Sequence, residues 1–85
     1  MPELRLTRRA KNDLTDLPPA VREAVLKTLD LISREPERNG KQLVGRMKGL
    51  WSARVGNYLA LYTNEPRQII IRAIRHRAVA YHRAR

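Results

Sequence analysis

Hydrophobic positions in the first half of the chain predict a short strand followed by a helix. Leu4-Arg5-Leu6 alternates apolar and polar residues, as one strand of a half-buried sheet does. Thr7 comes next and is a good helix N-cap, because its hydroxyl can accept from an amide one turn ahead. One helical face then carries apolar residues at steps of four and three: Ala10, Leu14 and Leu17.

A second helix is predicted after Pro18-Pro19, which ends the first helix and provides the fixed φ that starts another. Its apolar stripe consists of Val21, Ala24, Val25, Thr28, Leu29 and Ile32, and its polar face consists of Arg22, Glu23, Lys27 and Asp30. Pro36 and the polar turn 37–40 end it. The two helices are expected to form a hairpin. A DNA-reading helix-turn-helix is the competing interpretation, and the Pro-Pro joint and acid-balanced faces argue against it.

The second half of the chain changes to the period of strands. Gly56-Asn57 suits a two-residue hairpin loop, which would set Val55 opposite Tyr58 and Arg54 opposite Leu59. One sheet face, expected to support the helices, then holds Trp51, Ala53, Val55, Tyr58, Ala60 and Tyr62, and the other holds Ser52, Arg54, Leu59 and Leu61. After a turn at 64–67, a third strand from Gln68 to Ile74 is expected to be buried on both sides.

These elements predict an α+β fold of order β-α-α-β-β-β, with an antiparallel sheet packed against an N-terminal helical hairpin. The chain of 85 residues fits a single domain over 1–85, with 82–85 expected to fray. The absence of cysteine excludes disulfides and thiolate metal sites. No apolar run is long enough to span a membrane, and the first residues do not resemble a signal peptide, so we expect a cytoplasmic protein.

Charge is the strongest compositional signal, with a net +10. It is concentrated in residues 43–85, which contain nine basic residues and a single acidic one, Glu65. The net charge of this half is therefore +8, against +2 for residues 1–42. This asymmetry predicts a polyanionic partner, either nucleic acid or an acidic protein, the alternative being a solvated basic surface without a specific partner. The sequence has no paired carboxylates, metal-spaced histidines or glycine-rich phosphate loop, so glycosidase, metalloenzyme and nucleotide-hydrolase functions have no support.

Two segments of the second half resemble a known family. The run 49–62, Gly-Leu-Trp-Ser-Ala-Arg-Val-Gly-Asn-Tyr-Leu-Ala-Leu-Tyr, resembles the strand-turn-strand segment of RelE/ParE toxins, and 74–81 resembles their C-terminal His-Arg…Val-Tyr element. The spacing of residues upstream of these two segments also matches the family, so the resemblance covers nearly the whole chain. The resemblance implies the toxin of a type II toxin–antitoxin system: a metal-independent endoribonuclease, without a cofactor, that cuts mRNA in the ribosomal A site and is neutralised by a cognate antitoxin.

The resemblance also implies roles for individual residues. Arg54 and Arg75 match basic residues that hold phosphate and stabilise charge, and Tyr81 matches a tyrosine proposed for proton transfer or base stacking. His76 is a further catalytic candidate, since imidazole titrates near neutrality. The candidates for holding RNA are Arg46, Lys48, Arg77 and Ser52. For each there is an alternative: solvated charge or antitoxin contacts for the arginines, and a structural role for His76 and Tyr81. Trp51 and Tyr62 are interpreted as core residues.

The main departure from the family pattern is Leu59, where the residue after Gly-Asn-Tyr is typically a catalytic arginine. Ser52 and Val44 also stand where some members carry basic residues. The sequence therefore indicates a weakened natural member or a chain with an introduced inactivating substitution. Two other functions remain open: a ParE-like inhibitor of DNA gyrase, and a non-catalytic protein that binds nucleic acid or antitoxin.

Overall fold

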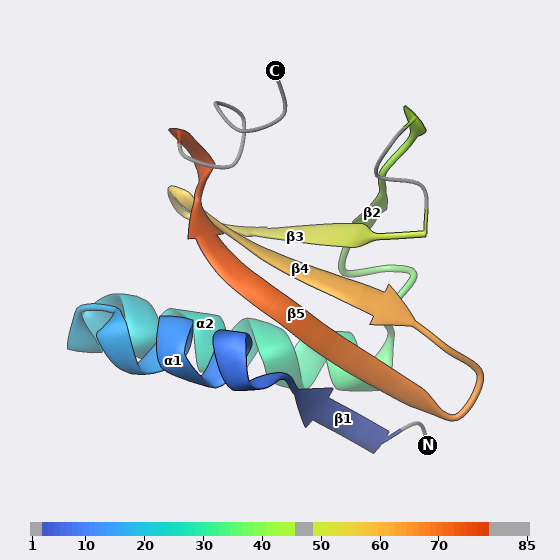
Figure 1. The fold of residues 1–85 in the computed structure, drawn as a ribbon, viewed down its shortest axis with the longest axis horizontal. Helices are drawn as coiled ribbons and strands as arrows, with labels where there is room; N and C mark the ends of the chain where they lie inside the picture. The colour runs from blue at the N-terminus through green and yellow to red at the C-terminus, as the bar shows by residue number, and fades with distance from the viewer. Residues whose placement is uncertain (1–2, 46–48, 79–85) are drawn as a thin grey trace.

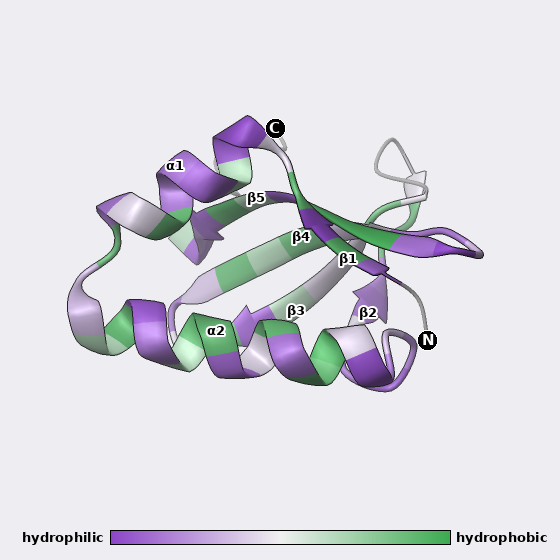
Figure 2. Ribbon diagram, turned by 90° about the horizontal axis from the view of Figure 1, so that it is seen from below, coloured by the Kyte–Doolittle hydropathy of each residue, from purple (hydrophilic) through white to green (hydrophobic). Residues whose placement is uncertain are grey.

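The computed structural model describes residues 3–45 and 49–78, which form two helices and one sheet (Figure 1). The elements are β1 (Glu3–Leu6), α1 (Arg8–Asp16), α2 (Pro19–Arg34), β2 (Lys41–Gln42), β3 (Trp51–Val55), β4 (Tyr58–Asn64) and β5 (Gln68–His76). Both helices lie on the same face of the sheet (Figures 1 and 2). The predicted α+β class and helical layer are confirmed, and the elements follow the predicted order with one additional strand, β2.

The sheet has the strand order β1-β5-β4-β3-β2 and is mixed, whereas an antiparallel sheet was expected. β1 pairs parallel with β5, with Leu4 opposite Ile69 and Leu6 opposite Ile71. The chain passes through both helices between β1 and the remaining strands, and such a crossover is what allows parallel pairing. The additional strand β2 pairs with β3 through Lys41 and Gln42, and its two exposed polar residues have no alternation that a sequence could reveal.

The helix boundaries follow the predicted signals. The Thr7 hydroxyl accepts from the amide of Ala10 at 3.1 Å, which confirms the N-cap. α2 begins at Pro19 and buries Val25, Leu29 and Ile32 against the sheet. Figure 2 shows apolar and polar residues alternating around it, as in an amphipathic helix. Neither described helix is long and apolar enough to cross a membrane.

Arg22 has a different environment from the one expected of a polar helix face. Its guanidinium donates to the carbonyls of Leu14, Thr15 and Leu17, at 3.2, 3.0 and 3.0 Å. The last carbonyls of a helix have no partner within it, and a basic side chain can satisfy them. Arg22 therefore joins the end of α1 to the start of α2, a contact that depends on tertiary structure and was not visible in the helical pattern.

We expect Arg22→Met to lower the free energy of unfolding by about 1–3 kcal/mol, because the carbonyls at the end of α1 lose their charged donor. Urea denaturation followed by circular dichroism measures this change. Lys27→Met is the matched control, since Lys27 is an exposed residue of the same helix. If the two variants unfold at the same urea concentration, the guanidinium does not stabilise the joint.

The core between helices and sheet is centred on Tyr62, whose side chain is fully buried. Its ring stacks on Trp51, with centroids 6.2 Å apart, and its hydroxyl donates to the carbonyl of Pro36 at 2.7 Å. Burial raises the pKa of Tyr62 to about 12, so the phenol keeps its proton and this hydrogen bond at neutral pH. The interpretation as a core residue is confirmed for Tyr62, and Trp51 is partly buried and packs against the core on the same side.

The β3–β4 hairpin has the predicted register. Gly56 and Asn57 form the loop, with Val55 opposite Tyr58 and Arg54 opposite Leu59. Gly56 has a φ of +59° and Asn57 has no positive φ, the signs expected of a type II′ turn. β5 extends two residues beyond the expected end, to His76, and the expected stretch 68–74 is less completely buried than predicted because Arg72 is exposed. The hairpin register decides which side chains face away from the helices.

Candidate functional site

The structure brings three of the candidate residues into one row across the sheet. Arg54 on β3 lies opposite Leu59 on β4, and Leu59 lies opposite Arg75 on β5. Directly opposed residues share a sheet face, and neighbouring strands are about 4.8 Å apart, so the Cα atoms of the two arginines flank Leu59 at about 10 Å from each other. We call the face that carries this row, turned away from α1 and α2, the open face; on β3–β5 it carries Ser52, Arg54, Leu59, Leu61, Thr63, Ile70, Ala73 and Arg75.

The three side chains of the row differ in exposure. Arg54 is exposed and its Nε donates to the carbonyl of Gly56 at 3.1 Å, whereas Arg75 is half-buried. Leu59 is only 7% exposed although it does not belong to the core cluster between helices and sheet. The row is therefore an aliphatic side chain between two guanidinium groups. Two cations held on a rigid sheet are suited to bind a phosphodiester.

The surroundings of the row are apolar at the centre and basic at the edges. The next row outward from the loop consists of Ser52, Leu61 and Ala73. On the two edge strands, Lys41 lies opposite Ser52 and Arg5 lies opposite Ile70, which places both at the rim of the open face. Sequence reasoning missed these two, because long-range strand pairing leaves no local signal. A positive rim of this kind attracts a polyanion.

His76 does not join the row. It lies opposite Tyr58, whose other partner Val55 packs against the core, so His76 belongs to the helix-side face at the end of β5. Its ring meets Tyr58 edge-on at 5.2 Å, and its Nδ1 accepts from the amide of Ala78. The reason is strand alternation: Arg75 and His76 are adjacent in sequence and must point to opposite faces.

The remaining candidates divide into described and undescribed residues. Ser52 lies on the open face beside the row, and the backbone amide of Arg77 donates to the carbonyl of Asn57 at 2.8 Å. Arg46, Lys48 and Tyr81 lie outside the described residues. The structure thus places Arg54, Leu59, Arg75 and Ser52 on one surface, and it does not describe the tyrosine expected to complete the site.

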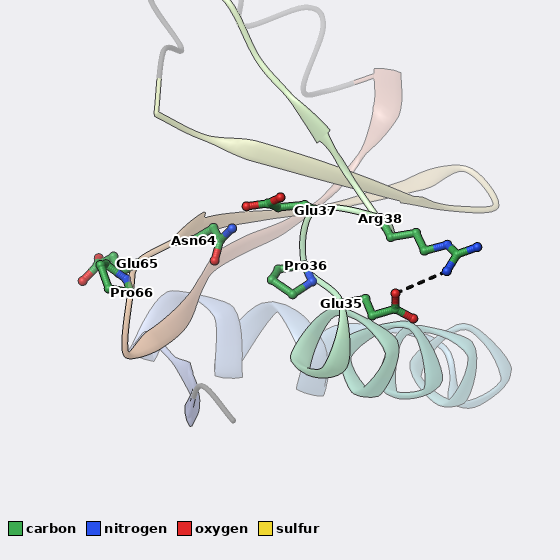
Figure 3. Close-up of a pocket in the computed structure, with 7 residues that line it drawn as sticks. All are labelled: Glu35, Pro36, Glu37, Arg38, Asn64, Glu65 and Pro66. Carbon is green, nitrogen blue, oxygen red and sulfur yellow. Dashed lines mark hydrogen bonds and ion pairs between the residues drawn. The ribbon is translucent and has the colours of Figure 1, made fainter.

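A cavity of about 670 Å³ lies at a different place, between the end of α2 and the β4–β5 turn (Figure 3). It is lined by Glu35, Pro36, Glu37, Arg38, Asn64, Glu65 and Pro66. Glu35 is paired with Arg38 at 3.4 Å and Glu65 with Arg72 at 3.9 Å, and the lining is acidic because it holds three glutamates and one arginine. Carboxylates repel phosphate, so this cavity does not suit a nucleic acid and the row on the open face is the better candidate.

Comparison with known proteins shows which family the chain belongs to. The sequence model of a family described as "ParE toxin of type II toxin-antitoxin system, parDE" matches residues 4–81. The chain is also similar to Toxin RelG of Mycobacterium tuberculosis, with 40% identity over 83 residues that cover 94% of this chain and 95% of the relative.

Two solved structures are similar to this chain in both fold and sequence. The toxin-antitoxin complex RelBE2 of M. tuberculosis contains a chain with a TM-score of 0.82 and 37% identity, covering 91% of this chain and 100% of its own. The archaeal RelE-RelB complex of Pyrococcus horikoshii contains one with a TM-score of 0.73 and 25% identity, covering 89% of this chain and 94% of its own.

Proposed function

The chain belongs to the RelE/ParE superfamily of type II toxin–antitoxin toxins, and on this premise we propose that it is an mRNA endoribonuclease that acts on the ribosome, with an activity weakened by Leu59. The observation that supports this proposal best is the row Arg54–Leu59–Arg75 on the open face. Two similar proteins, at 40% and 37% identity, carry Rel names, which favours this branch over the gyrase-directed branch.

The proposed reaction is an internal transfer within the RNA backbone. The ribose 2′-oxygen attacks the adjacent phosphorus, forming a P–O2′ bond while the P–O5′ bond breaks, and the products are a 2′,3′-cyclic phosphate and a 5′-hydroxyl. The 2′-hydroxyl loses a proton to a base, and the leaving 5′-oxygen receives one. Arg54 and Arg75 would stabilise the negative charge that accumulates on the phosphorane oxygens. The resemblance assigns Tyr81 a role in proton transfer or in base stacking.

The position of Leu59 explains why activity would be weak. It lies at the centre of the row, directly between the two arginines, where a side chain could contact the same phosphate as both of them. An aliphatic side chain offers no hydrogen bond to a phosphorane. Loss of one preorganised donor typically costs about 10²–10³ in rate.

The proposed partners are an antitoxin, the ribosomal A site and its mRNA. The structures of the similar toxins from M. tuberculosis and P. horikoshii are complexes with antitoxins. A largely disordered antitoxin segment that folds on binding can cover a wide, shallow surface such as a sheet face. The net charge of +10 favours acidic segments and RNA backbones alike.

Cleavage in a translation extract tests the proposal. Purified protein added to an in-vitro translation reaction is expected to cut the mRNA at the codon in the A site, detected by primer extension. We expect Arg54→Ala and Arg75→Ala each to reduce cleavage at least tenfold, because a hydrogen bond to a charged group contributes roughly 1.5–3 kcal/mol.

The matched control is Arg34→Ala, which removes an arginine on α2 that pairs with Asp30 at 3.4 Å and lies away from the open face. Cleavage that falls equally in the control, or that is unchanged in all three variants, would contradict the assignment of the row. Salt-dependent RNA binding with no cleaved product, even after Leu59→Arg, would instead indicate a non-catalytic member of the fold.

Inhibition of DNA gyrase is the second candidate function, because the family model that spans residues 4–81 is that of the ParE toxin. The same preparation incubated with gyrase and supercoiled plasmid distinguishes the two. Cleaved plasmid together with intact mRNA supports the gyrase function, and cleaved mRNA with intact plasmid supports the nuclease.

A further inference from the structure

The outward direction of Arg75 depends on an irregularity in β5. Ile69 and Ile71 face the helices. In a regular strand every second residue points to the same face, so residues 73 and 75 would also face the helices. Instead Ile74 is the next core residue. The register shifts between Leu61 and Tyr62: Tyr62 lies opposite Ile71 while Leu61 lies opposite Ala73. The shift leaves Arg72 as an extra residue, which is the signature of a β-bulge.

The bulge is held by two residues from the opposite end of the chain. The amide of Thr7 donates to the carbonyl of Ile71 at 3.0 Å, and the Thr7 hydroxyl donates to the carbonyl of Arg72 at 2.9 Å. The carboxylate of Asp13 accepts from the amide of Ile74 at 3.0 Å. Main-chain groups on both sides of the extra residue are therefore fixed by the start and middle of α1.

This arrangement follows from where β1 ends. β1 pairs with β5 only as far as Ile71, so the edge of β5 beyond that residue has no neighbouring strand in the described part of the chain. α1 continues from β1 and runs along this edge. Thr7 binds both β5 and α1, since the same hydroxyl that donates to β5 also accepts from the amide of Ala10 and caps α1. Asp13, one and a half turns further on, is half-buried and reaches the strand.

We propose that Thr7 and Asp13 are positioning residues, which hold the bulge in β5 and thereby keep Arg75 on the open face beside Leu59. The catalytic importance of Arg75 rests on the proposed function, whereas the control of its direction does not. A bulge near a functional residue commonly re-aims a side chain, and here removing it would exchange the faces of residues 73–76.

Thiol labelling measures the direction directly, because the chain contains no cysteine. Arg75→Cys places a thiol on the open face, and Ile74→Cys, at a residue that is 4% exposed, places one in the core. We expect a maleimide to react with the thiol at position 75 much faster than with that at position 74. Adding Asp13→Ala or Thr7→Val is expected to reduce the ratio of the two rates at least tenfold, since each removes a hydrogen bond that fixes the bulge.

Conservative variants separate positioning from general stabilisation. Asp13→Asn and Thr7→Ser keep an acceptor or a hydroxyl in place, and both are expected to restore the parent ratio. Arg9→Ala removes the ion-pair partner of Asp13, whose Nε lies 4.0 Å from the carboxylate. The carboxylate that accepts from the Ile74 amide remains, so the ratio of labelling rates should not change. Hydrogen exchange at the Ile74 amide gives a second measurement in chains without introduced cysteine, and we expect it to accelerate in Asp13→Ala.

The proposal is overturned if Asp13→Ala and Thr7→Val are folded and retain both the parent labelling ratio and the protection of the Ile74 amide. Cleavage assays in a Leu59→Arg background provide a separate readout, in which Asp13→Ala should reduce cleavage and Asp13→Asn restore it. If labelling changes as expected while no variant cuts mRNA, the positioning role is supported and the nuclease proposal fails.

Discussion

Leu59→Arg is expected to increase mRNA cleavage by about 10²–10³-fold, because it adds a donor to a row that already holds two guanidinium groups. Leu59 lies directly between Arg54 and Arg75 across three strands, so an arginine there could contact the phosphate that they flank. The rate of A-site cleavage in a translation extract measures the effect, and growth arrest on expression in cells provides a second readout.

The same substitution is expected to lower stability by about 1 kcal/mol. Like charges directly opposite each other in a sheet destabilise it, and the variant would place a cation between two others. Leu59 is also 7% exposed, so an arginine must extend its stem along the sheet to bring its head group to water. On the proposed function, we therefore expect Leu59 to favour stability at the expense of activity, an exchange that is common at functional sites.

Controls at the same position separate charge from shape. Leu59→Gln supplies a neutral amide donor without the cation and should recover much less activity than Leu59→Arg. Leu59→Lys supplies charge without the planar fork and should recover only part of the activity. The assignment of the row is wrong if Leu59→Arg is folded and its cleavage rate and toxicity do not exceed those of the parent.

The β3–β4 hairpin, which carries Arg54 and Leu59 of this row, was predictable because its loop signal and its alternation of polar and apolar residues agree. Gly56-Asn57 fixes the loop, period-two alternation fixes the faces, and together they place Leu59 opposite Arg54. The parallel pairing of β1 with β5 and the bulge at Arg72 had no such signal. Both arise from contacts between segments some sixty residues apart, such as Asp13 with Ile74. The sequence therefore predicted Arg75 as a candidate without revealing what aims it.

His76 and Arg22 are two further residues whose environment could not be predicted from the sequence. His76 was a candidate because of its chemistry, and alternation along β5 places it on the helix side against Tyr58. Arg22 belonged to a polar face by helical period, and its guanidinium binds the end of the preceding helix. Residue type predicted which groups can act, and tertiary packing decided which of them meet.

Gly40→Ala is expected to destabilise the protein by about 3 kcal/mol, the upper end of the cost of overpacking. Gly40 does not have a positive φ, so backbone strain is not the reason for a glycine here. A Cβ at this position would overlap the hydroxyl of Tyr62 and come within 2.8 Å of its Cζ. Tyr62 is fully buried and bound to Pro36, so its ring has no space into which to move. Thermal or urea unfolding measures the loss.

A double-mutant cycle with Tyr62→Phe identifies the cause. Tyr62→Phe alone is expected to cost about 1–3 kcal/mol, because the carbonyl of Pro36 loses its donor. In the double variant the overlapping oxygen is absent, so the combined cost should be less than the sum of the two by about 1 kcal/mol or more. Simple additivity would show that Gly40 and Tyr62 act independently. Gly45→Ala lacks any neighbour within 4 Å of the added Cβ but has a φ of +71°, so its cost should be unaffected by Tyr62→Phe.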